Sequence, residues 1–188
     1  ARLVVERAEH HYVRARAEER LGRVAQRHAQ LRRGARLLGP RGGAAREGVH
    51  LTLNGRDPAT LETAAQELKN TYSVEVAHVA GDIAEEGTRD ALLACTPEPD
   101  ILINNNGGPP PGRFQNWDRE AWIAALDANM LAPVLMIRAV LDGMVDRKFG
   151  RIVNITSAMV KTPLSPMGLS TGARTGLTSV VKAISRDV

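Results

Sequence analysis

Hydrophobic and polar positions alternate regularly from Gly48 onward, with short β-rich runs separated by longer stretches of helical spacing. The pattern predicts strands over 49–54, 74–80, 100–104 and 151–156, and helices over 57–70, 84–95, 117–147 and 170–187. Strands that alternate with helices are joined by right-handed crossovers. The expected fold class is therefore α/β: a Rossmann-like doubly wound parallel sheet with helices on both faces.

The helix after the first of these strands has the clearest local signals. Asp57 is expected to be its N-cap and Pro58 its first residue. One apolar face follows, made of Leu61, Ala64, Ala65 and Leu68.

The composition changes sharply near Ala44. Residues 1–43 contain no Lys, Ser, Thr, Asp, Asn or Ile, so a helix there would lack the usual capping side chains. Some positions are nevertheless spaced for one face of an Arg-rich amphipathic helix: Ala17, Leu21, Val24, His28 and Leu31. We predict an atypical N-terminal segment over 1–43 and a Rossmann-type domain over 44–188.

Three interpretations of segment 1–43 are open. A solvated surface helix is the plainest, and a basic arm that binds RNA or an acidic surface is the second. The third is an out-of-frame translation that resumes the correct frame near Ala44, which the biased composition suggests.

Charge is unevenly distributed along the chain. Residues 1–46 hold 12 Arg and 4 Glu, whereas residues 47–188 hold 13 basic and 17 acidic side chains, so the main body is mildly acidic. This argues against a nucleic-acid-binding fold there. The single cysteine, Cys95, excludes an internal disulfide framework. Because we recognise no membrane span and no signal peptide, a soluble cytoplasmic protein is expected.

Open parallel sheets bind ligands beyond the carboxyl ends of their strands, so the residues there are candidate site residues. Arg56 follows the first predicted strand without an acidic side chain at the strand tip. This favours the 2′-phosphate of NADP over the ribose hydroxyl of NAD. A solvated residue at a helix start is the alternative interpretation of Arg56.

The later strand ends carry short polar side chains and glycines, which let backbone approach a ligand closely. They are Asp82 and Ile83 in "GDI", Asn104, Asn106 and Gly107 in "NNNGG", and Ser157 in "NITS". Asn129 lies inside the apolar run "LDANMLAPVLMI". An asparagine in a helix interior is expected to hold a polar partner or a water. No metal site is predicted.

Together these features resemble the short-chain dehydrogenase/reductase (SDR) family, which includes 3-oxoacyl-acyl-carrier-protein reductases. The family's segments appear in order over residues 44–188, as "AREGVHLTLNGRD", "GDI", "DILINNNG", "LDANM" and "GRIVNITS". The resemblance implies a nicotinamide-dependent reductase of a small-molecule carbonyl substrate, with a Rossmann-type fold that is incomplete at both ends. It also implies a homo-oligomer, a dimer or tetramer, packed through helices 117–147 and 170–187.

The resemblance further assigns roles to individual residues. It implies that Asp82 and Ile83 flank the adenine and that Asn104 and Gly107 lie along the cofactor. Asn106 replaces the family's usual alanine. Asn129 would hold a proton-relay water, and Ser157 would hydrogen-bond the substrate carbonyl.

The family's catalytic tyrosine and lysine positions are occupied here by Ser170 and Arg174. Neither is a good proton donor. We expect Arg174 to bind the nicotinamide ribose and to offset charge on the substrate oxygen. Ser157 and Ser170 would form a two-hydroxyl oxyanion site, with water supplying the proton. The alternative is that Ser170 caps the following helix. The wording "GLS-x-GAR" is similar to that of a divergent branch of the family.

The Gly-rich turn on which the family's cofactor phosphates rest is absent, because its glycine positions hold Leu31, Ala35 and Leu37. No apolar strand is recognised before it. The expected function is an NADP-preferring reductase of a 3-oxoacyl or similar small ketone, impaired by these departures. The alternatives are a catalytically silent NADP(H)-binding or scaffold protein, and nucleic-acid binding through residues 1–43.

Overall fold

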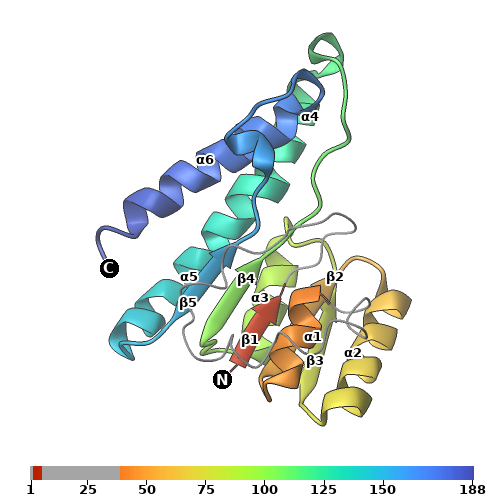
Figure 1. Ribbon diagram of the computed structural model, residues 1–188, viewed down its shortest axis with the longest axis vertical. Coiled ribbons are helices and arrows are strands. Elements are labelled where there is room, and N and C mark those ends of the chain that lie inside the picture. Colours follow the sequence, from red (N-terminus) through yellow and green to blue (C-terminus); the bar gives the residue numbers. More distant parts are fainter. Residues whose placement is uncertain (1, 6–38) are drawn as a thin grey trace.

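The computed structural model describes residues 2–5 and 39–188, which form a parallel five-stranded sheet with helices on both faces (Figure 1). The strands lie in the order β3-β2-β1-β4-β5. Their bounds are Arg2–Val5 (β1), His50–Gly55 (β2), Val76–Ala80 (β3), Ile101–Asn104 (β4) and Arg151–Asn154 (β5). This order confirms the predicted doubly wound α/β fold.

The central strand, β1, is one that the sequence analysis did not recognise. Val5 of β1 pairs with Leu53 of β2 on one side and with Ile103 of β4 on the other. The expectation of no apolar strand at the start of the chain was therefore wrong. The run "RLVV" lies in the Arg-rich segment, and no Gly, Pro, Asn, Asp or Ser follows it within residues 6–20 to mark the end of a strand. The predicted helix over Ala17–Leu31 and the positions of the missing Gly-rich turn lie outside the described residues.

Helices follow the strands as the alternating pattern predicts. Their bounds are Gly39–Arg46 (α1), Pro58–Tyr72 (α2), Glu86–Cys95 (α3), Arg119–Leu126 (α4), Ala132–Asp146 (α5) and Gly168–Ile184 (α6). Residues of α1 and α2 pack with β2 and β3 in one hydrophobic core, and residues of α3 and α5 pack with β4 in a second. The α1 helix spans the change of composition near Ala44.

The predicted start of α2 is confirmed. The Asp57 Oδ1 atom accepts a hydrogen bond of 2.8 Å from the backbone N–H of Thr60, and Pro58 is the first residue of the helix. Leu61, Ala65 and Leu68 are buried, as their spacing predicts. This helix fixes the position of the residues at the end of β2, which lead directly into it.

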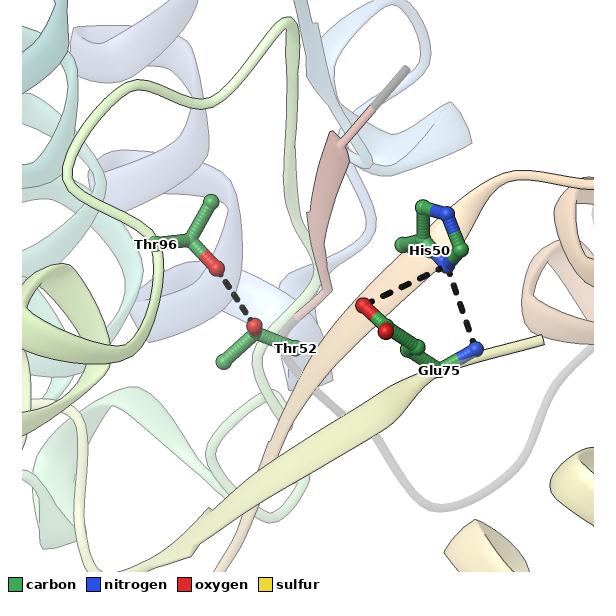
Figure 2. Close-up of polar contacts among 4 residues, drawn as sticks. All are labelled: His50, Thr52, Glu75 and Thr96. Atoms are coloured by element: carbon green, nitrogen blue, oxygen red, sulfur yellow. Dashed lines mark hydrogen bonds and ion pairs between the residues drawn. The ribbon is translucent and has the colours of Figure 1, made fainter.

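The opposite side of β2 faces α3. Leu51 and Leu53 belong to the first core, so the side chain between them points to the other face of the sheet. There the Thr52 Oγ1 lies 2.6 Å from the Oγ1 of Thr96, directly after α3 (Figure 2). At the start of β2, His50 Nδ1 accepts the Glu75 N–H at 3.1 Å. These contacts tie β2 to α3 and β3.

One continuous helical run, Arg119–Asp146, joins α4 to α5 through a π-helical segment, Asp127–Leu131. By length and composition alone this run could cross a membrane, a test that the core helix of a soluble protein also passes. The reason is that apolar residues lie on its exposed side as well as on its buried side. Ile123, Leu131 and Leu135 are exposed, whereas Met136, Ile137 and Val140 are buried in the second core.

Candidate functional site

Two adjoining hollows lie at the carboxyl ends of the strands. One, of about 370 Å³, is at the ends of β2 and β3, and the other, of about 530 Å³, extends toward α4. They share five lining residues: Arg56, Asp82, Asn106, Gly107 and Gly108. Ile83 lines the smaller hollow, and Asn129 lines the larger one. The structure thus brings most of the predicted site residues into one continuous trough.

Asparagines at the strand ends hold the sheet together beneath this trough. Asn54 Nδ2 donates to the carbonyl oxygens of Val79 and Gly81, both at 3.0 Å. Asn104 Nδ2 donates to Asn154 Oδ1 at 2.8 Å. Asn104 is thus a buried connector between β4 and β5. The sequence analysis missed Asn54 and Asn154. Asn54 is the next-to-last residue of β2, and Asn154 is the last residue of β5.

The turn after β4 is fixed by the side chain of Asn106. Its Oδ1 accepts the Gly107 N–H at 2.8 Å, and its Nδ2 donates to the Ala128 carbonyl oxygen at 3.0 Å. That carbonyl is available because the Ala132 N–H donates to Asp127, and Pro133 has no N–H to donate. The π-helical segment therefore provides the acceptor that anchors the turn.

Asn129 is the buried polar residue of this π-helical segment. Its side chain is only 3% exposed, and its Oδ1 has no hydrogen-bond partner among the described residues. A buried carbonyl oxygen without a partner costs free energy unless water or a ligand donates to it. Asn129 also lines the larger hollow, although this oxygen itself is buried.

Arg174, on α6, joins the loops that follow β4 and β5. Its Nη1 donates to the Ile155 carbonyl oxygen at 2.6 Å, and its Nη2 donates to the Asn106 carbonyl oxygen at 2.9 Å. The residue is 8% exposed, and its Nε has no partner in the described part of the chain. Burial lowers the pKa of the guanidinium from its ordinary value, because desolvation disfavours the charged form.

Ser170 lies one turn before Arg174 on the same face of α6. It is 4% exposed. The helix begins at Gly168 after Met167, so the interpretation of Ser170 as its N-cap was wrong. A Cβ added at Gly108 would lie 3.6 Å from Ser170 Oγ and 3.8 Å from Arg174 Nη2. Gly108, which lines both hollows, therefore lies close to this pair.

Ser157 follows β5 and begins the short 3-10 helix Ala158–Val160, against which α6 packs. Its Oγ accepts the Met159 N–H at 3.1 Å, which leaves the hydroxyl hydrogen able to donate. Lys161, at the end of that short helix, is exposed. Neither hollow is lined by Ser157, Ser170 or Arg174. We refer to these three residues together as the oxygen pocket, because the family resemblance assigns them to the substrate oxygen.

Trp117 is a lining residue of the larger hollow that the sequence analysis missed. Its ring packs edge-on against Trp122, with centroids 6.2 Å apart. A Cβ added at Gly168 would lie 2.5 Å from its Cζ3 atom, so the glycine makes room for the ring. The Gly112 N–H donates to the Pro166 carbonyl oxygen at 2.9 Å, which joins residues 109–112 of the hollow's lining to the segment before α6.

Comparisons with known proteins agree with this architecture. The family model described as short chain dehydrogenase matches residues 43–188. The acetoacetyl-CoA reductase of Cupriavidus necator is 37% identical over 100 residues, which cover 53% of this chain and 40% of that protein. Human "inactive hydroxysteroid dehydrogenase-like protein 1" is 27% identical over 150 residues, covering 76% of this chain and 45% of that protein.

A solved structure shows the same fold. The crystal structure of L-sorbose reductase from Gluconobacter frateurii, complexed with NADPH and L-sorbose, superposes with a TM-score of 0.74 at 28% identity. The match covers 78% of this chain and 57% of that one. The chain spans about half the length of the curated relatives it matches.

The role of Arg174 in joining the two loops is testable. Arg174→Met should lower the free energy of unfolding by about 2 kcal/mol, because two buried carbonyl oxygens lose their donors. Arg174→Lys should lose less, since an ammonium can still donate to one of them. Urea unfolding measures both, with Arg138→Met on the exposed side of α5 as the control. Wild-type stability in Arg174→Met would show that the guanidinium does not hold the loops.

Proposed function

This chain belongs to the short-chain dehydrogenase family, and on that premise we propose that the protein is an NADP-preferring oxidoreductase that reduces a carbonyl compound by hydride transfer. The observation that carries the proposal is the continuous trough, with an exposed arginine at its β2 end and Asn129 at its other end. The L-sorbose reductase that this structure resembles was crystallised with NADPH, which supports the choice of cofactor.

The residues present fit such a cofactor. Arg56 is exposed beyond β2, where its guanidinium would bind a 2′-phosphate, while the carboxylate next to it in the sequence, Asp57, caps α2. Ile83 and Asp82 would flank the adenine. A Cβ added at Gly107 would meet nothing within 4 Å, so this backbone leaves open space for a bound group. NADPH, when bound, supplies the hydride.

The oxygen pocket would hold the substrate carbonyl. The hydroxyls of Ser157 and Ser170 donate hydrogen bonds, and the nearby charge of Arg174 offsets negative charge on the oxygen. None of the three supplies a proton as a phenol would. Loss of a placed general acid costs on the order of 10²- to 10⁴-fold in rate, so ketone reduction should be slow. Similarity to an acetoacetyl-CoA reductase supports a 3-oxoacyl or similar small ketone.

Two alternatives and two further expectations accompany this proposal. A catalytically silent NADP(H)-binding protein is the second candidate function, favoured by the missing proton donor and by the similarity to a human relative named as inactive. Exposed apolar residues along α4 and α5, among them Ile123 and Leu135, support a homo-oligomer that packs through this helix. We also expect the protein to be located in the cytoplasm. Nucleic-acid binding through residues 1–43 stays a prediction on a segment of which the structure describes only residues 2–5 and 39–43.

Cofactor preference is tested by titrating the protein with NADPH and NADH under calorimetry. NADPH should bind more tightly, and Arg56→Ala should weaken NADPH binding at least tenfold while leaving NADH binding nearly unchanged, because only NADPH carries the 2′-phosphate. Arg186→Ala, at an exposed arginine beyond α6, is the matched control. If both substitutions change NADPH affinity equally, Arg56 does not contact the cofactor. If NADPH does not bind at all, the proposed function is refuted.

Restoring the proton donor tests whether the site can reduce ketones. Ser170→Tyr/Arg174→Lys should raise the rate of NADPH-dependent acetoacetyl thioester reduction by at least tenfold, within the range that a placed general acid contributes. Stopped-flow absorbance of NADPH measures the rate. If NADPH binds to the variant but no ketone is reduced, the catalytically silent alternative is favoured.

A further inference from the structure

The lining of the larger hollow changes in character along its length. Its ionisable residues, Arg56 and Asp82, lie just beyond β2 and β3. Its other end lies against α4 and the start of α6, two helices that pack together beyond the sheet (Figure 1). Apart from the exposed Asn116, the side chains at that end are apolar: residues 109–111, Trp117, four alanines and Leu169. We call this set the apolar chamber.

One wall of the apolar chamber is a face of alanines. They recur at the helical spacing i, i+3, i+4 and i+7, as Ala121, Ala124, Ala125 and Ala128. Ala125 is buried beneath this face, and Ala124 is exposed. A methyl group fills little volume and forms no hydrogen bond. The alanine face therefore leaves space open and offers an occupant apolar contact only.

Trp117 provides the largest apolar side chain of the chamber. A Cβ added at Gly112 would lie 2.7 Å from its Nε1 atom, and one added at Gly168 would lie 2.5 Å from its Cζ3 atom. Two glycines thus make room for the ring. Phe114 and Trp122 pack edge-on against it, with centroids 6.3 and 6.2 Å away. The ring is held in place before a ligand arrives, which lowers the entropy cost of binding.

The two adjoining hollows therefore suit different chemical groups. The smaller one has Arg56, Asp57 and Asp82 in its lining, which suits the polar and charged groups of a nucleotide. In the apolar chamber, a charged group would lose its hydration without gaining a partner of opposite charge. An uncharged apolar group would gain from burial of its surface there. The volume of the larger hollow, about 530 Å³, is in the usual range of small-molecule sites.

We propose that the apolar chamber binds the substituent of the carbonyl substrate, so that the substrate class is a ketone with an uncharged alkyl or aryl substituent. Trp117 and Ala124 are then specificity-determining residues. The inference rests on the proposed function: the carbonyl carbon accepts the hydride that NADPH supplies, and its oxygen takes a proton from water. The alcohol and NADP⁺ are the products. Ketones that carry a carboxylate at the same distance from the carbonyl are excluded.

Two matched methyl ketones test the substrate class by binding alone. 4-Phenylbutan-2-one and 4-oxopentanoate have the same two-carbon spacer, which ends in a phenyl ring or in a carboxylate. The phenyl ketone should bind at least tenfold more tightly, because even one methylene in an apolar pocket changes affinity by about tenfold or more. The chain has two tryptophans, so binding is followed by the shift of the Trp117 indole N–H signal in ¹⁵N NMR spectra. Trp117→Phe identifies that signal.

A charge placed in the chamber tests the location. Ala124→Glu should weaken binding of the phenyl ketone at least tenfold, since the new carboxylate takes water into the chamber. Ala94→Glu, at an exposed alanine of α3 that lines neither hollow, is the matched control and should leave the affinity unchanged.

Three results would overturn the inference: equal affinities for the two ketones, tighter binding of 4-oxopentanoate, or an unchanged affinity in Ala124→Glu. These titrations contain no NADPH, so they are independent of the calorimetric test of the proposed function. NADPH binding without a preference between the ketones would overturn the substrate class alone.

Discussion

The contact on which the site depends is the double hydrogen bond from the Arg174 guanidinium to the carbonyl oxygens of Ile155 and Asn106. These two residues lie in loops that follow neighbouring parallel strands, and such loops diverge where the strands end. One side chain from α6 holds them together. This buries a cation, and desolvation disfavours its charged form. Two carbonyl dipoles, and no carboxylate among the described residues, compensate the charge.

Asn106 carries this link onward to the long helix. Its carbonyl oxygen accepts from Arg174, and its side-chain amide donates to Ala128 in the π-helical segment. The same segment buries Asn129 with its oxygen unpaired. The turn after β4 is thus held from α6 and from α4–α5 at once, so the geometry of the trough and that of the oxygen pocket are coupled through one residue.

The sequence allowed the order of strands and helices, the start of α2 and most of the trough residues to be predicted. These features depend on local capping and on the rule that strand ends gather at one edge of a parallel sheet. The four-residue β1 was missed because it lies in the Arg-rich segment without a turn signal after it, whereas β4 and β5 are equally short but were recognised. The hydrogen bonds from Arg174 to Ile155 and Asn106, and from Asn106 to Ala128, join residues far apart in the sequence. No local sequence pattern predicts such contacts.

The central claim is that the oxygen pocket stabilises negative charge and contains no side chain that gives up a proton near neutral pH. The pH dependence of kcat for carbonyl reduction at saturating NADPH tests this most directly, because a general acid in the complex appears as a titration of kcat. The account predicts a kcat that changes by no more than about twofold between roughly pH 6 and pH 9. A sigmoidal fall in kcat within that range would reveal a titrating proton donor and contradict it.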